Sequence, residues 1–311
     1  MASTARKDFL DGLHACRTAT DHGLVRASDA TGAFLRRGLT VSAFNLLETF
    51  LSDRIEELSA HINGGRTQFS DLPESLQKRA IANTLEVSVS RARRLSSDVS
   101  TLRSFSKRLG QSLAAVDQGL DLSPLTWMWS GSNMAANDYA SVLRSFHIFE
   151  PWKSSLDLAG RLAFQILDYS GNPIDVQNEM TNLARERHRC AHTASYNVTT
   201  IWIRVLPDQI LRFAVVFDIL ASVGASLLRN GDPAFLANEQ YVTATMVGLR
   251  FIRERSGDFA EFTETGVRAT SRNSDPSTLF TRAARRCGST DAVVQQDLSK
   301  AIVNWEIPAV G

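Results

Sequence analysis

The sequence predicts an all-α fold, built from a bundle of long helices and a C-terminal helical extension. Apolar residues recur at steps of three and four over long stretches, which is the pattern of amphipathic helices. Strict alternation of apolar and polar residues, the pattern of half-buried strands, is almost absent. The composition, 43% hydrophobic and 22% charged, is that of an ordinary globular protein rather than a disordered chain.

Two long helices are expected in the first part of the chain. The first covers 39–62 and carries an apolar stripe from Phe44 to Ile62. The second covers 74–116 and follows Pro73, a residue that favours the start of a helix. Each stripe needs a partner surface, so we expect both helices to pack in the core of the bundle.

The middle of the chain is expected to contain a loop and four more helices. The loop begins near position 121 and is rich in tryptophan, so it is expected to pack on the bundle. The helices are expected over 138–149, 155–169, 174–193 and 207–230. Pro207 opens or kinks the last of them.

The best candidate for a domain boundary is the segment 230–233, Asn-Gly-Asp-Pro. We therefore divide the chain into an N-terminal helical segment (1–34), a bundle (35–230) and a C-terminal helical extension (231–311). Three helices are expected in the extension, over 239–255, 277–286 and 291–305.

Charge and cysteine content restrict the class of protein. The 34 basic and 33 acidic residues nearly cancel, so a net charge of +1 provides no overall field to attract nucleic acid, and any such site must be local. The three cysteines form no C-x-x-C pair, which argues against a disulfide framework or a zinc ribbon and fits a reducing compartment. The N-terminus has no apolar signal region, and no run of about 18 apolar residues is long enough to span a membrane. We therefore expect a cytoplasmic protein without membrane contact.

The helix expected over 174–193 contains an arginine at an apolar position. Its apolar stripe continues through Arg187 to Ala191. An unpaired guanidinium is costly to bury, so Arg187 must face an anion, a carboxylate or a wet cleft. His188 and His192 are one turn apart on a shared face. A polar side chain that breaks the pattern in this way often marks a functional site.

Residues 187–192, RHRCAH, resemble the signature of the HEPN superfamily, in which a histidine follows an arginine by five positions. Residues 40–58 resemble the early helix of this family, with Glu48 at the place of its buried glutamate. The SGSN segment (130–133), the short helix and the EPW that follow it, the motif helix and a closing apolar helix are similar in order to the RiboL-PSP-HEPN subgroup. The resemblance covers about 35–228 and implies a HEPN-like helical bundle.

The resemblance implies a metal-independent endoribonuclease without a cofactor, which cleaves single-stranded RNA through attack of the ribose 2′-hydroxyl and leaves 2′,3′-cyclic phosphate ends. His192 would be the general acid and base, because imidazole exchanges protons near neutral pH. Arg187 would hold the phosphate, and His188 or Glu48 would orient this pair. Family members join two motif helices across a dimer, so a homodimer that acts as a toxin or antiviral defence effector is implied.

The sequence departs from the family pattern at two positions. His188 follows the arginine where asparagine or aspartate is usual. Ala194 stands where one variant of the family has a tyrosine. Regulation that depends on that tyrosine is therefore not expected.

Two other functions fit the sequence. The chain could be a non-catalytic HEPN-like dimerisation or sensor module, with the extension 231–311 binding a regulatory protein partner. It could instead be a zinc enzyme that uses His188 and His192, but Cys190 lies off their shared face and no third ligand is apparent. The basic residues in 91–108 could contact RNA phosphates, although such runs usually solvate a helix face.

Overall fold

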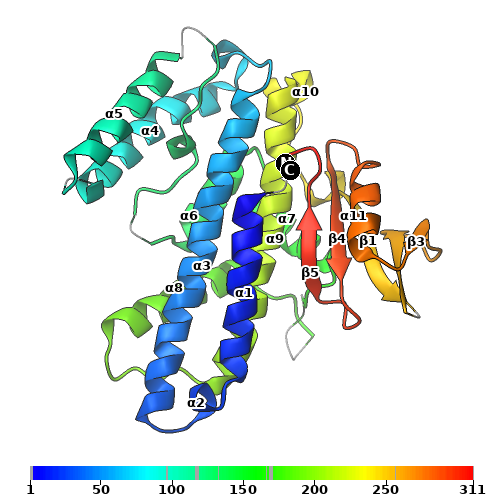
Figure 1. The fold of residues 1–311 in the computed structure, drawn as a ribbon. Coiled ribbons are helices and arrows are strands. Elements are labelled where there is room, and N and C mark those ends of the chain that lie inside the picture. The colour runs from blue at the N-terminus through cyan, green and yellow to red at the C-terminus, as the bar shows by residue number, and fades with distance from the viewer. Residues whose placement is uncertain are drawn as a thin grey trace.

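The computed structural model describes residues 3–95, 97–115, 119–131, 133–165, 167, 171–255 and 257–310. Helices dominate the chain up to Leu236, and a five-stranded sheet follows (Figure 1). The helices are α1 (Thr4–Asp21), α2 (Gly23–Arg26), α3 (Ala30–Asn63), α4 (Glu74–Leu95), α5 (Val99–Ala114), α6 (Ala136–Ser145), α7 (Pro151–Arg161), α8 (Val176–His192), α9 (Thr200–Asn230), α10 (Pro233–Leu236) and α11 (Pro276–Ala284). The strands are β1 (Gly248–Arg255), β2 (Asp258–Thr263), β3 (Ser271–Asn273), β4 (Asp291–Gln296) and β5 (Ile302–Glu306).

Helices α3 and α9 lie side by side at the centre of the bundle, and α1 packs against both (Figure 1). Every residue of α9 from Ile210 to Leu228 is buried. The helix is long and apolar enough to cross a membrane, and its most apolar stretch is entirely buried inside the protein, where the central helix of a bundle lies. These two helices confirm those expected over 39–62 and 207–230, and each begins earlier in the chain than expected.

The helix expected over 74–116 is two helices, α4 and α5, which form a hairpin at one end of α3 (Figure 1). The side chain of Asp98 begins α5 by accepting a hydrogen bond from the Ser100 N–H at 3.0 Å. Such an N-cap starts a new helix. Apolar periodicity continues on both sides of the break, so the stripe does not reveal it. Val116, the expected end of the stripe, lies outside the described residues.

The tryptophan-rich segment packs on α4 and the bundle, as expected. Trp127 is fully buried and stacks on Phe146, with ring centroids 5.1 Å apart. Asn83 on α4 donates hydrogen bonds to the carbonyl oxygens of Leu125 and Met128, at 2.8 and 3.0 Å. Trp127 is therefore part of the core.

Helices α6 and α8 confirm the helices expected over 138–149 and 174–193, whereas α7 covers only the first half of the helix expected over 155–169. Helix α7 begins at Pro151, whose fixed φ suits the first turn, and ends earlier than expected, at Arg161. Positions 166 and 168–170, within or next to the expected end, are not among the described residues.

The C-terminal part is not the helical extension expected from the sequence, so the all-α fold class is wrong. It contains a five-stranded mixed sheet in the order β3-β2-β1-β4-β5, in which β1 pairs antiparallel with β2 and parallel with β4. The helix expected over 239–255 is largely β1, and the helix expected over 291–305 is β4 and β5. Of the three expected helices, the one over 277–286 is present as α11.

The apolar pattern does not reveal strands β1 and β4, because they are central strands with buried residues on both faces. Phe251 and Val294 pack in the main core, whereas Ile252 and Val293 pack against α11. In β4 the residues from Ala292 to Val294 form a continuous apolar run, which periodicity cannot distinguish from a buried helix. In β1, Arg250 and Arg253 interrupt the apolar residues, so neither pattern is complete. The β-branched residues of β4 are the signal that favours a strand.

The segments 1–34, 35–230 and 231–311 share one hydrophobic core. The ring of Trp305 on β5 lies 6.2 Å from that of Phe9 on α1, measured between centroids. It lies 6.1 Å from that of Phe50 on α3. The sheet therefore packs on the helices through its own aromatic side chains.

A buried ion cluster also ties the sheet to the bundle. Asp218 on α9 is fully buried and accepts hydrogen bonds from Arg54 Nε at 2.6 Å and Trp305 Nε1 at 2.8 Å. Arg6 donates to the same carboxylate, at 3.2 Å. Burial by itself would raise the pKa of Asp218, but the cations of Arg54 and Arg6 outweigh burial and the pKa is lowered. One carboxylate thus joins α1, α3, α9 and β5.

We expect His61, near the end of α3, to contribute to the pH dependence of stability. Arg229 on α9 donates a hydrogen bond to the carbonyl oxygen of His61 at 2.6 Å. Burial first, and then the Arg229 cation, lower the pKa of His61 from 6.5 to about 4. Between these values the unfolded chain binds a proton that the folded protein does not, so stability falls as the pH drops through this window.

The variant His61→Gln should therefore lose less stability than the wild type between pH 6.5 and pH 4. The expected difference is about 1–2 kcal/mol, because solvent reaches part of the ring and weakens the effect. Urea unfolding of both proteins at the two pH values measures it. Equal losses in the two proteins would contradict this role of His61.

Candidate active site

Helix α8 presents the arginine and histidine motif. The side chain of Asp175 caps its start by accepting a hydrogen bond from the Asn178 N–H at 2.9 Å. Its buried residues are Val176, Met180, Leu183, Glu186 and Cys190. The expected stripe is correct for the first three of these, but Ala191, which was expected to continue it, is exposed. The helix packs against α3 (Figure 1).

Arg187 of α8 and Glu48 of α3 interact electrostatically where the two helices pack, but no ion pair joins them. Its side chain is half-buried, and its Nε is shielded from solvent and has no hydrogen-bond partner among the described residues. Glu48 is also half-buried and accepts a hydrogen bond from the backbone N–H of Met134. Burial raises the pKa of Glu48, while the Met134 N–H and the Arg187 cation act in the opposite direction. Arg187 is therefore attracted by the charge of Glu48 but forms no hydrogen bond or ion pair with it or with another described residue.

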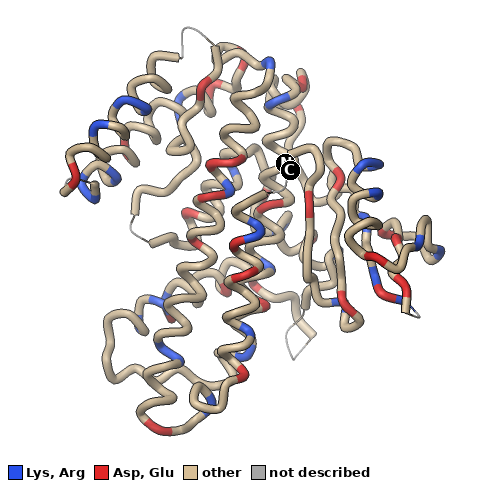
Figure 2. The backbone as a smooth tube through the Cα atoms, viewed as in Figure 1, with Lys and Arg blue, Asp and Glu red and all other residues tan. Residues whose placement is uncertain are grey.

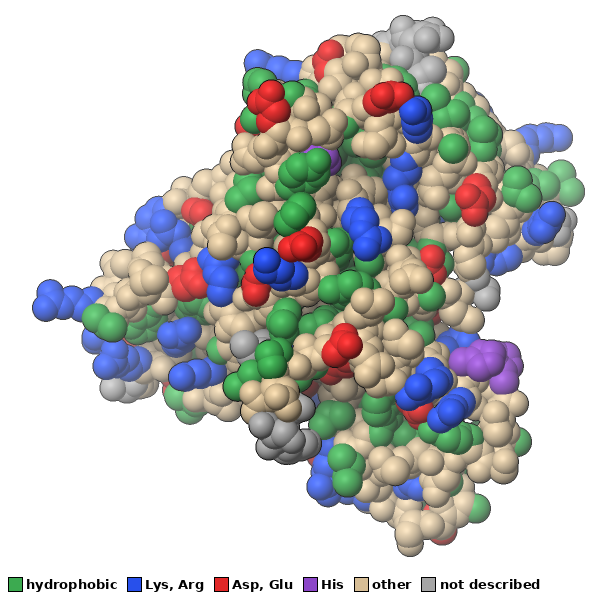
Figure 3. Space-filling view, turned by 180° about the vertical axis from the view of Figure 1, so that it is seen from behind, with side chains coloured by type: hydrophobic (Ala, Val, Ile, Leu, Met, Phe, Trp, Pro, Cys, Tyr) green, Lys and Arg blue, Asp and Glu red, His purple; other side chains and the backbone are tan. Residues whose placement is uncertain are grey.

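His188 and His192 are both exposed, and their ring centroids lie 4.6 Å apart at a 49° tilt. His192 is the last residue of α8. On the back face of the molecule, histidine side chains lie at the surface beside Lys or Arg side chains (Figure 3). The structure thus places His188 beside His192, and it leaves Arg187 within electrostatic range of Glu48 without a hydrogen bond or ion pair between them. Within the described residues no hydrogen bond or ion pair joins one pair to the other.

A second set of contacts, which the sequence reasoning missed, lies at the end of α8. The Tyr196 hydroxyl donates a hydrogen bond to the buried carboxylate of Glu186. The Arg189 guanidinium lies over the Tyr196 ring, 5.5 Å from its centroid, and 3.5 Å from the Glu186 carboxylate. These contacts hold the turn that follows His192.

Arg36 of α3 fixes the next part of this loop. It is buried, and its Nε donates to the Val198 carbonyl at 2.7 Å while its terminal nitrogen donates to Asn197 Oδ1 at 3.0 Å. The sequence could have indicated Arg36 in the same way as it indicated Arg187. Arg36 stands four residues before the buried Thr40, so it is an arginine on the buried face of its helix.

The zinc alternative requires a third ligand beside His188 and His192. In the part of the chain that the structure describes, no group of three His, Cys, Asp or Glu side chains is placed to hold a metal ion. Cys190 is buried, whereas both imidazoles are exposed. The side chains of α8 thus supply a half-buried guanidinium and two exposed imidazoles.

The variant Glu48→Gln should be more stable than the wild type at pH 7, on the order of 1 kcal/mol. The pKa of Glu48 is raised above 4.5, so ionisation costs the folded protein stability as the pH rises through that pKa. Glutamine keeps the acceptor for the Met134 N–H and does not ionise. Urea unfolding at pH 7 and pH 4 measures the gain, which should vanish at pH 4. Lower stability of the variant at pH 7 would mean that the attraction to Arg187 outweighs burial.

No family model, curated protein or solved structure matches this chain. A function must therefore be inferred from the side chains of α8 and their surroundings.

Proposed function

We propose that the chain is a metal-independent endoribonuclease of the HEPN type, resembling the RiboL-PSP-HEPN subgroup, which cleaves single-stranded RNA. The observation that carries the proposal is the surroundings of the Arg187 side chain. Its half-buried guanidinium is attracted by Glu48 and forms no hydrogen bond or ion pair with a described residue, and the exposed His188 and His192 lie in the same two turns of α8. A fixed cation and a solvated imidazole are the two groups that phosphodiester transfer needs.

The reaction is an internal transfer. His192 accepts the proton of the ribose 2′-hydroxyl, the 2′-oxygen attacks the adjacent phosphorus, and the bond from phosphorus to the 5′-oxygen breaks. The leaving 5′-oxygen takes up a proton, which an imidazolium can supply. The products are a 2′,3′-cyclic phosphate and a 5′-hydroxyl. Arg187 binds the phosphoryl oxygens on which negative charge builds, and Glu48 positions Arg187.

A homodimer fits the exposure of the motif. Both histidines and Ala191 lie at the surface of α8, so a second copy can approach this helix closely. Two copies of α8 would then form one groove with two copies of Arg187 and four histidines. In this proposal the enzyme is a cytoplasmic toxin or antiviral effector that acts on RNA.

A non-catalytic interaction module is the second candidate, and an apolar stripe on α4 favours it. Ile81, Leu85 and Val89 are four residues apart and are 41%, 46% and 53% exposed. Apolar residues at this spacing form one face of a helix, which suits a partner surface. The partner of such a module would be a regulatory protein, and the module would not cleave RNA.

The test is incubation of the purified chain with single-stranded RNA in the presence of EDTA. We expect fragments with 2′,3′-cyclic phosphate ends and no cleavage of a matched DNA strand. His192→Ala should abolish the fragments. Cleavage by His192→Ala at the wild-type rate would exclude the assigned role, and an intact RNA would favour the interaction module.

A further inference from the structure

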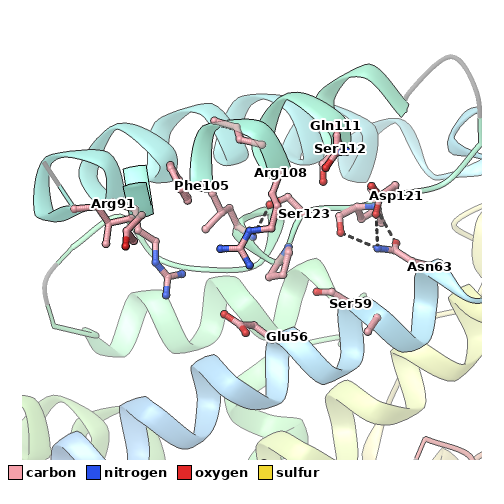
Figure 4. A pocket seen from close by; sticks show the side chains of 17 residues that line it. Glu56, Ser59, Asn63, Arg91, Phe105, Arg108, Gln111, Ser112, Asp121 and Ser123 are labelled. Carbon is pink, nitrogen blue, oxygen red and sulfur yellow. Dashed lines mark hydrogen bonds between the residues drawn. The ribbon is translucent and has the colours of Figure 1, made fainter. Parts of the chain in front are cut away.

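A cavity of about 490 Å³ lies between the α4–α5 hairpin and α3 (Figure 4). Its walls are apolar at Leu95, Phe105 and Leu109 of the hairpin and at Leu125. Its volume lies within the range of small-molecule sites, roughly 300–1,000 Å³. The wall is preformed, because the side chain of Asn63 exchanges two hydrogen bonds with the backbone of Leu122, at 2.9 and 3.0 Å.

The cavity is separate from the candidate active site. Glu56 of α3 lines it and stands eight residues after Glu48. At 1.5 Å per residue, this separation is about 12 Å along the helix. A ligand in the cavity would therefore occupy a different part of α3 from the phosphate proposed at Arg187.

Two guanidinium groups reach into the cavity from the hairpin. Arg91 of α4 and Arg108 of α5 extend toward α3 (Figure 4). Arg108 has no hydrogen bond or ion pair with any described residue. Arg91 donates to the sulfur of Met128 and is attracted by Asp53. Lys and Arg residues recur along this hairpin (Figure 2). Two guanidinium groups above an apolar wall suit a phosphate carried by an apolar ring.

The opposite wall has a different chemistry. Glu56 extends from α3 toward the two arginines (Figure 4). It is exposed and has no hydrogen bond or ion pair among the residues that the structure describes. A free carboxylate repels a second anion and accepts hydrogen bonds from hydroxyl or amino groups. The ligand should therefore be anionic at one end only and carry hydrogen-bond donors at the other.

We propose that this cavity binds a nucleoside monophosphate. The phosphate lies between Arg91 and Arg108, and the base packs against Phe105 and Leu109, because every base offers an aromatic face. Ribose hydroxyls or a base amino group donate to Glu56. A nucleotide unites the three features that the walls require in one molecule of the right size: an anion, an aromatic ring and several donors.

The test is calorimetric titration of the full chain with AMP, GMP, CMP and UMP, and with inorganic phosphate as the reference anion. We expect at least one nucleotide to bind more tightly than phosphate. Arg108→Gln should weaken that binding by roughly ten- to hundredfold, the loss of charge-assisted hydrogen bonds. The matched control is Arg103→Gln, which changes an exposed arginine of the same helix that does not line the cavity and should bind as the wild type does. Unchanged circular dichroism of both variants shows that the hairpin is folded.

His192→Ala separates this proposal from the nuclease. This variant should bind the nucleotide as tightly as the wild type does, and its binding does not depend on RNA cleavage. Loss of nucleotide binding in His192→Ala would place the ligand at α8 and overturn the proposal. The proposal would also be overturned if Arg108→Gln bound the nucleotide as tightly as the wild type does. The same holds if phosphate bound as tightly as every nucleotide, or if no nucleotide bound at millimolar concentration.

Discussion

Replacing His192 with alanine is expected to lower the rate of RNA cleavage by about 100- to 10,000-fold. The exposed imidazole at the end of α8 is the group assigned to take the 2′-hydroxyl proton, and alanine cannot replace it. Because the side chain is exposed, its loss should change the free energy of unfolding by less than about 0.5 kcal/mol. Initial rates on a labelled single-stranded RNA, with urea unfolding of the same samples, measure both effects.

The matched control is His14→Ala, which removes an exposed histidine of α1. It should cleave RNA at the wild-type rate. Arg187→Ala should lose about 100- to 1,000-fold in rate, and Arg187→Lys should recover only part of it, because an ammonium cannot donate to two phosphoryl oxygens in a fixed geometry. A loss in His14→Ala equal to that in His192→Ala would show that the effect is not specific to α8.

The second large effect is expected at Asp218. Asp218→Asn should lower the free energy of unfolding by about 3–5 kcal/mol, because it leaves the guanidinium groups of Arg54 and Arg6 buried without their shared carboxylate. The amide oxygen of the variant can still accept the hydrogen bond from Trp305 Nε1, and the side chain keeps its shape. The lost stability is therefore due to the missing charge. Urea unfolding at pH 7 measures it.

Asp208→Asn is the matched control for this variant. Asp208 lies on the same helix and pairs with Arg17 at 2.9 Å, but its side chain is 70% exposed. The expected loss is about 0–1 kcal/mol, because solvent screens the pair. If the two variants were equally stable, the buried cluster would not be the contact that holds the sheet to the bundle.

The helices that carry the motif could be predicted because their stripes are long and have one period. Helix α3 follows this pattern, as does α8 as far as Leu183, whereas α9 was predicted from a stripe although it is buried on all sides from Ile210 to Leu228. The sheet could not be predicted in this way. Strands β1 and β4 have buried apolar residues on both faces, which removes the alternation that identifies a strand.

Part of the candidate site could also be predicted. Arg187 interrupts an apolar stripe, and this alone indicates that it needs a carboxylate or an anion; in the structure it lies within electrostatic range of Glu48 without forming an ion pair. The contacts of Tyr196 with Glu186 and of Arg36 with Val198 depend on where the chain turns after α8. Nothing in the spacing of these residues specifies the turn, so these contacts follow only from the tertiary structure.

The most direct test of the proposed chemistry is the removal of a single oxygen from the substrate. An RNA strand is first cut by the purified chain in EDTA to map one cleavage site, and the nucleotide 5′ of that bond is then replaced by its 2′-deoxy form. Internal attack requires the missing hydroxyl, so we predict that cutting stops at this bond and continues at others. Continued cutting at the deoxy position would show that water or another group is the nucleophile, and the roles assigned to Arg187 and His192 would then be wrong.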